Sequence, residues 1–242
     1  MANPTFEQKE SMDISKLNWA AIYDSLNQRG YASIPNMMTT QGCEELISLY
    51  GNSQLYRNVI NMQRYRFGKG EYKYFNYPLP PVIQTLREGM YTPLSKIANT
   101  WMKYLSIDTE FPEQHADLLQ QCKALQQERP TPLILCYQTG GYNTLHQDLY
   151  GDIYFPFQVV IALKQKGKDY EGGEFVLTEQ VPRAQSKAEV LTPDQGDAII
   201  FTTNFRPVKG SRGYYRAAMK HGISEVRSGE RYALGIIFHD AS

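Results

Sequence analysis

The second half of the chain alternates short apolar runs with turn-forming residues. After Pro130, clusters of Gly, Pro and Asp separate one run from the next. Runs of this length, closely spaced, are typical of buried strands in an antiparallel barrel or jelly roll. The runs are residues 133–137, 157–163, 175–177, 198–201 and 232–238. This grammar predicts that the second half forms the β core of the protein.

The first half is predicted to be mainly helical. Apolar residues recur at helical spacing over residues 17–29, 81–105 and 112–129, and we expect Pro93 to divide the second of these regions into two helices. Gly30 should end the first helix, and Thr39 or Thr40 should cap another. The expected fold is therefore α+β and mainly β in its second half. We expect one domain over 1–242, with 1–130 as helical support and substrate lid and 131–242 as the core.

Charge and cysteine content limit the possible partners and compartment. The chain has 25 Lys and Arg against 25 Asp and Glu, so no overall field attracts nucleic acid or anionic lipid. Its three cysteines form no Cys-x-x-Cys pair, which favours free thiols in a reducing compartment. We see no signal peptide and no apolar run long enough to span a membrane. The expected location is the cytoplasm, with no membrane partner.

A candidate metal site lies in the segment that follows the first apolar run. Gly140-Gly141 predicts a tight turn, and the strand leaving it should carry His146 and Asp148. Side chains at i and i+2 of a strand share a face, so this imidazole and carboxylate can bind one ion. A second such pair, His115 and Asp117, falls in a predicted helix, where i and i+2 diverge. We therefore expect His115 to be an ordinary residue of a helix surface.

A mononuclear iron site of the oxygenase type needs two imidazoles and one carboxylate, with open positions for a cosubstrate and oxygen. His221 is the preferred third ligand, and His239 is the alternative. Arg231 follows His221 by ten residues and opens the run RYALGIIF. A cation at the mouth of an apolar strand needs an anionic partner, and the fork of Arg matches a carboxylate.

Together these residues resemble the Fe(II)/2-oxoglutarate-dependent dioxygenases, and in particular the branch that contains prolyl 4-hydroxylase catalytic domains. The resemblance covers roughly residues 133–240 and depends on the spacing of several short motifs. These are Tyr137 nine residues before His146, Gly140-Gly141, His146-x-Asp148, Gly172-Gly173, Gly196-Asp197-Ala198, His221, Arg231 and Phe238-His239-Asp240.

The resemblance implies a double-stranded β-helix (jelly roll, cupin-like) that holds Fe(II) between His146, Asp148 and His221. Arg231 would bind the distal carboxylate of 2-oxoglutarate, and Tyr137 would donate a hydrogen bond to the same cosubstrate. The implied reaction consumes O2 and 2-oxoglutarate, releases succinate and CO2, and hydroxylates a C–H bond, with ascorbate as an optional stimulant. A barrel that binds a metal or a small acid without turnover is the non-enzymatic alternative.

Two substrate classes remain open. Aromatic residues alternate with Lys and Arg in residues 61–77, where Arg64, Arg66, Tyr72 and Tyr74 are candidates for binding the substrate. A second basic cluster includes Arg216. Such residues suit oxidative demethylation of an alkylated nucleic-acid base, as some bacterial members of the family are predicted to perform. The motifs lean slightly towards hydroxylation of a protein side chain, a peptide or a small molecule. The segment is also consistent with a hairpin that packs its rings inward.

Overall fold

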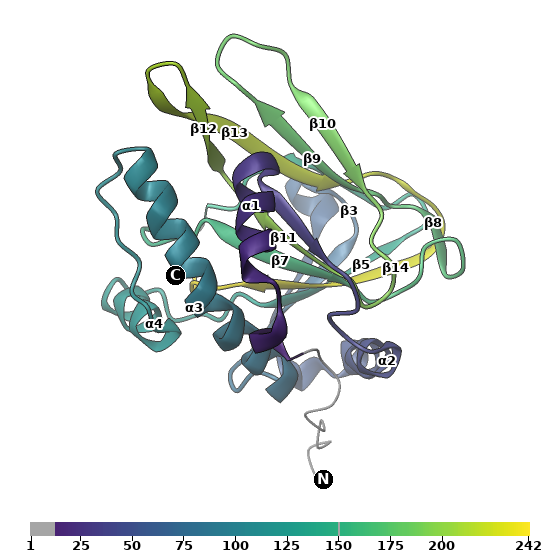
Figure 1. Ribbon diagram of the computed structural model, residues 1–242. Coiled ribbons are helices and arrows are strands. Elements are labelled where there is room, and N and C mark those ends of the chain that lie inside the picture. The colour runs from purple at the N-terminus through teal and green to yellow at the C-terminus, as the bar shows by residue number, and fades with distance from the viewer. Residues whose placement is uncertain (1–12, 150) are drawn as a thin grey trace.

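The computed structural model describes residues 13–149 and 151–242, which form two antiparallel sheets with helices on one side (Figure 1). In the larger sheet the strand order is β1-β11-β7-β14-β5-β4-β2, and β8 also pairs with β14. Its strands are β1 (Tyr31–Ile34), β2 (Tyr56–Asn61), β4 (Glu71–Phe75), β5 (Leu133–Gln138), β7 (Phe157–Ala162), β8 (Tyr170–Gly172), β11 (Ala198–Thr202) and β14 (Val226–Ile237).

The smaller sheet has the order β10-β9-β13-β6-β3, and β12 also pairs with β13. Its strands are β3 (Gly68–Lys69), β6 (Tyr142–His146), β9 (Phe175–Gln180), β10 (Lys187–Leu191), β12 (Phe205–Gly210) and β13 (Gly213–Ile223). One apolar cluster lies between the sheets, with Phe175, Phe201 and Ala233 among its members. The predicted α+β fold with a β core in the second half is confirmed.

Helices cover the outer face of the larger sheet. They are α1 (Trp19–Arg29), α2 (Thr40–Ser48), α3 (Pro81–Tyr104) and α4 (His115–Ala124), with short 3₁₀ turns at Ile14–Lys16, Leu49–Gly51, Ser53–Leu55 and Met62–Tyr65. A second apolar cluster joins them to the sheet, and the rings of Trp101 and Phe157 lie 4.7 Å apart within it. Two predicted helix ends are confirmed. Gly30 ends α1 with φ of 77°, and the Thr39 side chain accepts a hydrogen bond from the Gly42 amide.

Pro93 does not divide α3, so the prediction of two helices was wrong. The helix continues from Pro81 to Tyr104, with Pro93 inside it. Proline removes one hydrogen bond of the helix ladder, but Met90 before it and Leu94, Ala98 and Trp101 after it are buried against the same core. Tertiary packing on both sides of Pro93 therefore outweighs the local cost. The helix predicted over 112–129 is also shorter and spans only His115–Ala124.

His115 is buried, and the expectation of a surface position was wrong. It lies on the same face of α4 as the buried Leu118 and Cys122, because positions i, i+3 and i+7 of a helix point the same way. Its Nε2 is 2.7 Å from the Phe238 carbonyl oxygen, to which it donates a hydrogen bond. Burial, and then the nearby charge of Arg87, lowers the pKa of His115 to about 4. His115 is therefore a neutral part of the core.

A buried ion pair fastens the C-terminal segment to α3. Arg87 Nη2 lies 2.7 Å from Asp240 Oδ1, and both side chains are almost wholly buried. The guanidinium also donates hydrogen bonds to the carbonyl oxygens of Ile237, Phe238 and His239. The motif Phe238-His239-Asp240 thus has a structural role in this chain.

Within residues 13–149 and 151–242, no helix has the length and apolar character needed to cross a membrane.

Acid should destabilise the fold through its buried histidines. Burial lowers the pKa of His239 to about 3, as it lowers that of His115 to about 4, from an ordinary value of 6.5. The unfolded chain therefore binds protons that the folded chain does not bind. The contribution of these histidines to the free energy of unfolding is complete above pH 6.5 and is lost as the pH falls. The loss should be about 2 kcal/mol per histidine at pH 5. Urea unfolding between pH 7 and 5 measures it, and a His115→Gln variant should show a flatter pH dependence; an unchanged slope would contradict the assignment.

Candidate active site

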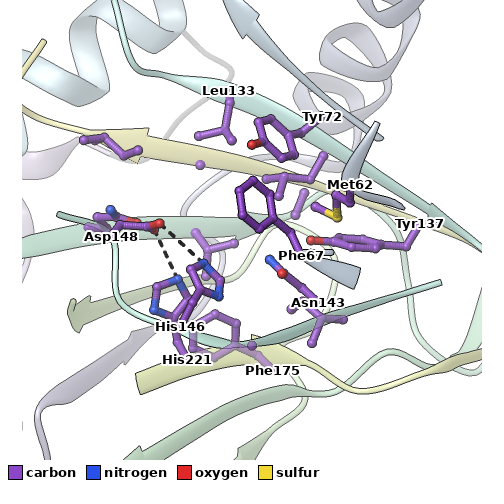
Figure 2. Close-up of a pocket in the computed structure, with 18 of the residues that line it drawn as sticks. Met62, Phe67, Tyr72, Leu133, Tyr137, Asn143, His146, Asp148, Phe175 and His221 are labelled. Carbon is purple, nitrogen blue, oxygen red and sulfur yellow. Dashed lines mark ion pairs between the residues drawn. The ribbon is translucent and has the colours of Figure 1, made fainter. Parts of the chain in front are cut away.

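The three predicted metal ligands lie together between the two sheets. His146 ends β6 and His221 is its cross-strand partner on β13, with ring centroids 4.2 Å apart. Asp148 reaches both rings: its Oδ1 is 3.4 Å from His146 Nε2, and its Oδ2 is 3.3 Å from His221 Nε2. The ligand atoms of the three residues all lie within 4.8 Å of one another. Figure 2 shows the carboxylate facing both imidazoles.

Asp148 does not lie on the strand as predicted, because β6 ends at His146. The intervening Gln147 donates hydrogen bonds to the carbonyl oxygens of Asn204 and Met219, each at 2.8 Å. These bonds hold the chain where it leaves the sheet, and the carboxylate reaches the imidazoles from a loop. The His-x-Asp spacing thus brings both groups to one point, although by a different local geometry from the one expected.

Hydrogen bonding and charge prepare these side chains for a cation. His146 Nδ1 is 2.7 Å from the Thr144 carbonyl oxygen, to which it donates a hydrogen bond, so Nε2 is the ring atom that faces Asp148. Burial alone would raise the pKa of Asp148, but the hydrogen bonds and charges of the two histidines hold it well below its usual value. The carboxyl group is therefore ionised. Two imidazole nitrogens and a carboxylate form the donor set that suits Fe(II) and leaves coordination positions open.

His239, the alternative ligand, lies elsewhere. It is fully buried, and its Nδ1 accepts a hydrogen bond from the Phe155 amide at 3.0 Å. Among the described residues, the group of potential ligands that lie close enough to share one ion contains His221 and not His239.

Arg231 and Tyr137 form a buried polar end of the same cavity. They are cross-strand partners on β14 and β5, and the Arg231 guanidinium carbon is 5.7 Å from the centre of the Tyr137 ring. Arg231 is 2% exposed, yet no Asp or Glu of the described residues lies within ion-pair distance of it. Its Nε and the Tyr137 hydroxyl also lack hydrogen-bond partners there. Burial raises the pKa of Tyr137, so its hydroxyl keeps its proton and can donate it in a hydrogen bond.

The position of Arg231 differs from the prediction in one respect. It does not open its strand, because β14 begins five residues earlier at Val226. Gly173 makes room for it: a Cβ atom there would lie 2.9 Å from Arg231 Cδ, and its φ of +61° also favours glycine. Of the paired glycines Gly172-Gly173, Gly173 thus allows the Arg231 side chain to lie inside the barrel.

One cavity of about 250 Å³ connects the metal ligands to Arg231 and Tyr137. Two of the five predicted substrate residues, Tyr72 and Tyr74, line it. The other three lie outside its lining and are exposed. Arg64 lies in the 3₁₀ turn Met62–Tyr65, Arg66 follows that turn, and Arg216 lies over the ring of Phe205 at 5.0 Å. The segment 61–77 is thus divided between cavity and surface.

Sequence reasoning missed several residues of the cavity wall, namely Met62, Phe67, Asn143, Phe175 and Gln158. Figure 2 shows Phe67 between the metal ligands and Tyr137, with Asn143 beside the tyrosine hydroxyl. Gln158 left a signal that could have been read: it is the polar residue in the buried strand FQVVIA. The others have no distinctive pattern, because their place depends on strand pairing far along the chain.

Residues 70–241 match the sequence model of a family, Oxygenase-NA, described as an oxygenase that catalyses oxidative methylation of damaged DNA. The match covers well over half of the chain and contains all three candidate metal ligands. The chain belongs to this oxygenase family. Two curated relatives of this oxygenase, uncharacterized proteins from two strains of Mycobacterium tuberculosis, are each 48% identical to it over 168 residues. That alignment covers 69% of this chain and 72% of theirs.

Solved structures show the same fold at low sequence identity. A 2OG-Fe(II) oxygenase family oxidoreductase from Burkholderia pseudomallei has a TM-score of 0.56 and 15% identity, over 94% of this chain and 93% of its own. A prolyl-4-hydroxylase from Pseudomonas putida has a TM-score of 0.53 and 12% identity, over 93% and 99%. The predicted double-stranded β-helix is confirmed. Family, fold and the His-Asp-His group agree on the predicted class: the protein is an Fe(II)- and 2-oxoglutarate-dependent oxygenase.

Proposed function

We propose that this oxygenase binds Fe(II) through His146, Asp148 and His221, and binds the distal carboxylate of 2-oxoglutarate through Arg231 and Tyr137. The observation that carries the proposal is the buried Arg231, which has no carboxylate partner among the described residues and opens into the cavity that holds the three ligands. A buried guanidinium is costly unless an anion pairs with it. A dicarboxylate that reached from Arg231 to the metal would supply that anion.

The bound metal, with 2-oxoglutarate and O2, would supply the oxidant that hydroxylates a C–H bond, while the cosubstrate leaves as succinate and CO2. The residues of the chain hold and shield these groups. Arg231 would form two parallel hydrogen bonds to the carboxylate, and the Tyr137 hydroxyl would donate a third. The rings of Phe175 and Phe201 lie 6.1 and 4.7 Å from the His221 ring, and keep water from that side of the ligands.

We propose that the substrate is a nucleic-acid base that carries an N-methyl group. The description of the family supports damaged DNA as the substrate, and Tyr72 and Tyr74 give one wall of the cavity aromatic surface against which a base can lie. Insertion of one oxygen atom into a methyl C–H bond gives an N-hydroxymethyl group, which releases formaldehyde and leaves the N–H. The reaction thus removes a methyl group. A flipped or single-stranded base would be needed to reach the metal.

Hydroxylation of a peptide or protein side chain is the second candidate. Its support is the shared fold of solved prolyl hydroxylases, including one from Trichoplax adhaerens in complex with a peptide fragment, at a TM-score of 0.52 and 14% identity over 93% of this chain and 94% of that one. Release of formaldehyde from methylated oligonucleotides, compared with hydroxylation of proline-containing peptides, would separate the two.

We also propose that Arg64, Arg66 and Arg216 contact the substrate outside the cavity. We further propose that the protein is cytoplasmic and that residues 1–242 form a single domain.

Arg231→Met should raise the KM for 2-oxoglutarate by about 100-fold or more, since it removes a buried charge-assisted contact. The variant should melt no lower than the wild type without cosubstrate, because the wild type buries an unpaired cation. It should also lose the rise in Tm that N-oxalylglycine, an inert mimic of the cosubstrate, gives the wild type. Succinate formation and thermal melts measure these effects.

Arg227→Met is the matched control, because Arg227 lies on the same strand but its side chain is 64% exposed and pairs with Glu171. It should leave both the KM and the response to N-oxalylglycine unchanged. A wild-type KM in the Arg231→Met variant would refute the carboxylate site.

A further inference from the structure

The cavity extends well beyond the space that 2-oxoglutarate can fill. Four alternate residues of β14 line it, namely Arg231, Ala233, Gly235 and Ile237. At a rise of about 3.4 Å per residue, the first and last of these positions lie about 20 Å apart. A five-carbon dicarboxylate held at Arg231 spans well under half of that length. The end of the cavity near Ile237 is therefore available to the substrate.

Gln158 stands at this far end. It is the cross-strand partner of Ile237, it is 6% exposed, and it lines the cavity. Its side-chain nitrogen is buried and has no hydrogen-bond partner among the described residues. Leaving a buried amide donor unsatisfied is unfavourable, so such a group in a cavity wall indicates a missing hydrogen-bonding partner. A half-turn of the amide exchanges its oxygen and nitrogen, so either atom can be offered to a ligand.

The surroundings of Gln158 suit a flat group placed close to the metal ligands. Phe201 is its cross-strand partner on β11, and the Phe201 ring is 4.7 Å from that of His221. Nearer Arg231, Tyr72 and Tyr74 line the cavity from β4, level with Ala233 and Gly235 of β14, with ring centroids 5.4 Å apart and planes at 86°. The part of the cavity beyond the cosubstrate thus combines walls of aromatic rings with one amide that can both donate and accept a hydrogen bond. It lies next to the ligands, where the atom to be oxidised must come.

We propose that Gln158 is the residue that selects the substrate base, by pairing its amide with a donor and an adjacent acceptor on the base edge. This inference rests on the proposed function. An amide matches the N6 amine and N7 of adenine in this two-point way. 3-Methylthymine offers no such pair, because its N3 carries the methyl group in place of the proton, so the site should prefer a methylated adenine to this methylated thymine.

The test compares wild type, Gln158→Met and Gln158→Asn on single-stranded oligonucleotides that carry 1-methyladenine or 3-methylthymine. Formaldehyde release gives kcat/KM for each, and succinate formed without oligonucleotide reports the metal and cosubstrate site. Gln158→Met keeps the shape and removes the amide. It should lower kcat/KM for 1-methyladenine by about 10- to 100-fold and change that for 3-methylthymine by less than about 3-fold. Gln158→Asn retains the amide on a shorter stem, so its kcat/KM for 1-methyladenine should lie between the values for the wild type and for Gln158→Met.

Neither basal succinate formation nor Tm should fall in Gln158→Met, because the side-chain nitrogen has no hydrogen-bond partner among the described residues that its loss would leave unpaired. Gln138→Met is the matched control, since Gln138 is exposed on β5 and bonds Glu230 outside the cavity. The inference is overturned if Gln158→Met keeps wild-type selectivity, or if it loses basal succinate formation or Tm, which would show a structural role. If the wild type forms succinate but oxidises neither oligonucleotide, the proposed substrate class fails and this inference fails with it.

Discussion

Replacing His221 with alanine should abolish succinate formation, with a loss of at least about 1,000-fold. The residue supplies one of only three protein ligands in the proposed site. Neither a methyl group nor a neighbouring side chain can replace the imidazole, because the rings beside it belong to His146, which is already a ligand in that site, and to Phe175 and Phe201. The measurement is succinate formed from 2-oxoglutarate with Fe(II) in excess, together with the Fe(II) content of the purified protein.

His239→Ala is the control for this experiment, because His239 is the other histidine that the sequence offered as third ligand. Its imidazole accepts a hydrogen bond from the Phe155 amide, away from the metal ligands. The variant should be less stable but should still bind Fe(II) with the stoichiometry of the wild type. Retention of iron by His221→Ala with its loss from His239→Ala would reverse the assignment.

Arg87→Met should destabilise the fold by about 3 to 5 kcal/mol, as expected when one partner of a buried ion pair is removed. Asp240 would remain buried with its charge, and the carbonyl oxygens of residues 237–239 would each lose one donor. Urea unfolding at pH 7.5 measures the change. Asp240 would still have the hydroxyl of Tyr77, 2.9 Å from its Oδ2, which moderates the loss.

The double variant Arg87→Met, Asp240→Leu gives the control. It removes both charges, so it should recover part of the lost stability even though it is changed at two positions. The exposed pair Lys96 and Glu113 on the same side of the protein provides a comparison, because loss of a surface ion pair should cost about 1 kcal/mol or less. A loss of that size for Arg87→Met would contradict the role of a buried clamp.

The sequence predicted most of the β core because its strands are short, apolar and separated by clear turn signals. It also predicted the His146, Asp148 and His221 set from spacing and residue type, and the structure places these side chains together. It failed where tertiary contacts decide the outcome. Pro93 was expected to break a helix that core packing holds together. His115 was expected at a surface, although its spacing to Leu118 and Cys122 already indicated the buried face.

The cavity beyond the ligands could not be predicted in the same way. Gln158, Tyr72 and Ile237 come from three strands, and only the order of β4, β5, β14 and β7 in the larger sheet brings them into one cavity wall. Nor could the sequence show that Arg231 lacks an acidic neighbour, since that requires the positions of every carboxylate around it. Spacing along one strand is visible in an amino-acid sequence, whereas the order of the strands across a sheet is not.

The two imidazoles of the site belong to neighbouring strands, and the chain between them makes two long hairpins whose tips project away from the barrel (Figure 1). Strand pairing, and not the length of the connecting chain, therefore sets the distance between these ligands. Relatives could lengthen or shorten either hairpin tip without moving the iron. The fold can in this way vary the surface at its rim, and with it the molecule that it binds there, while the metal ligands keep their positions.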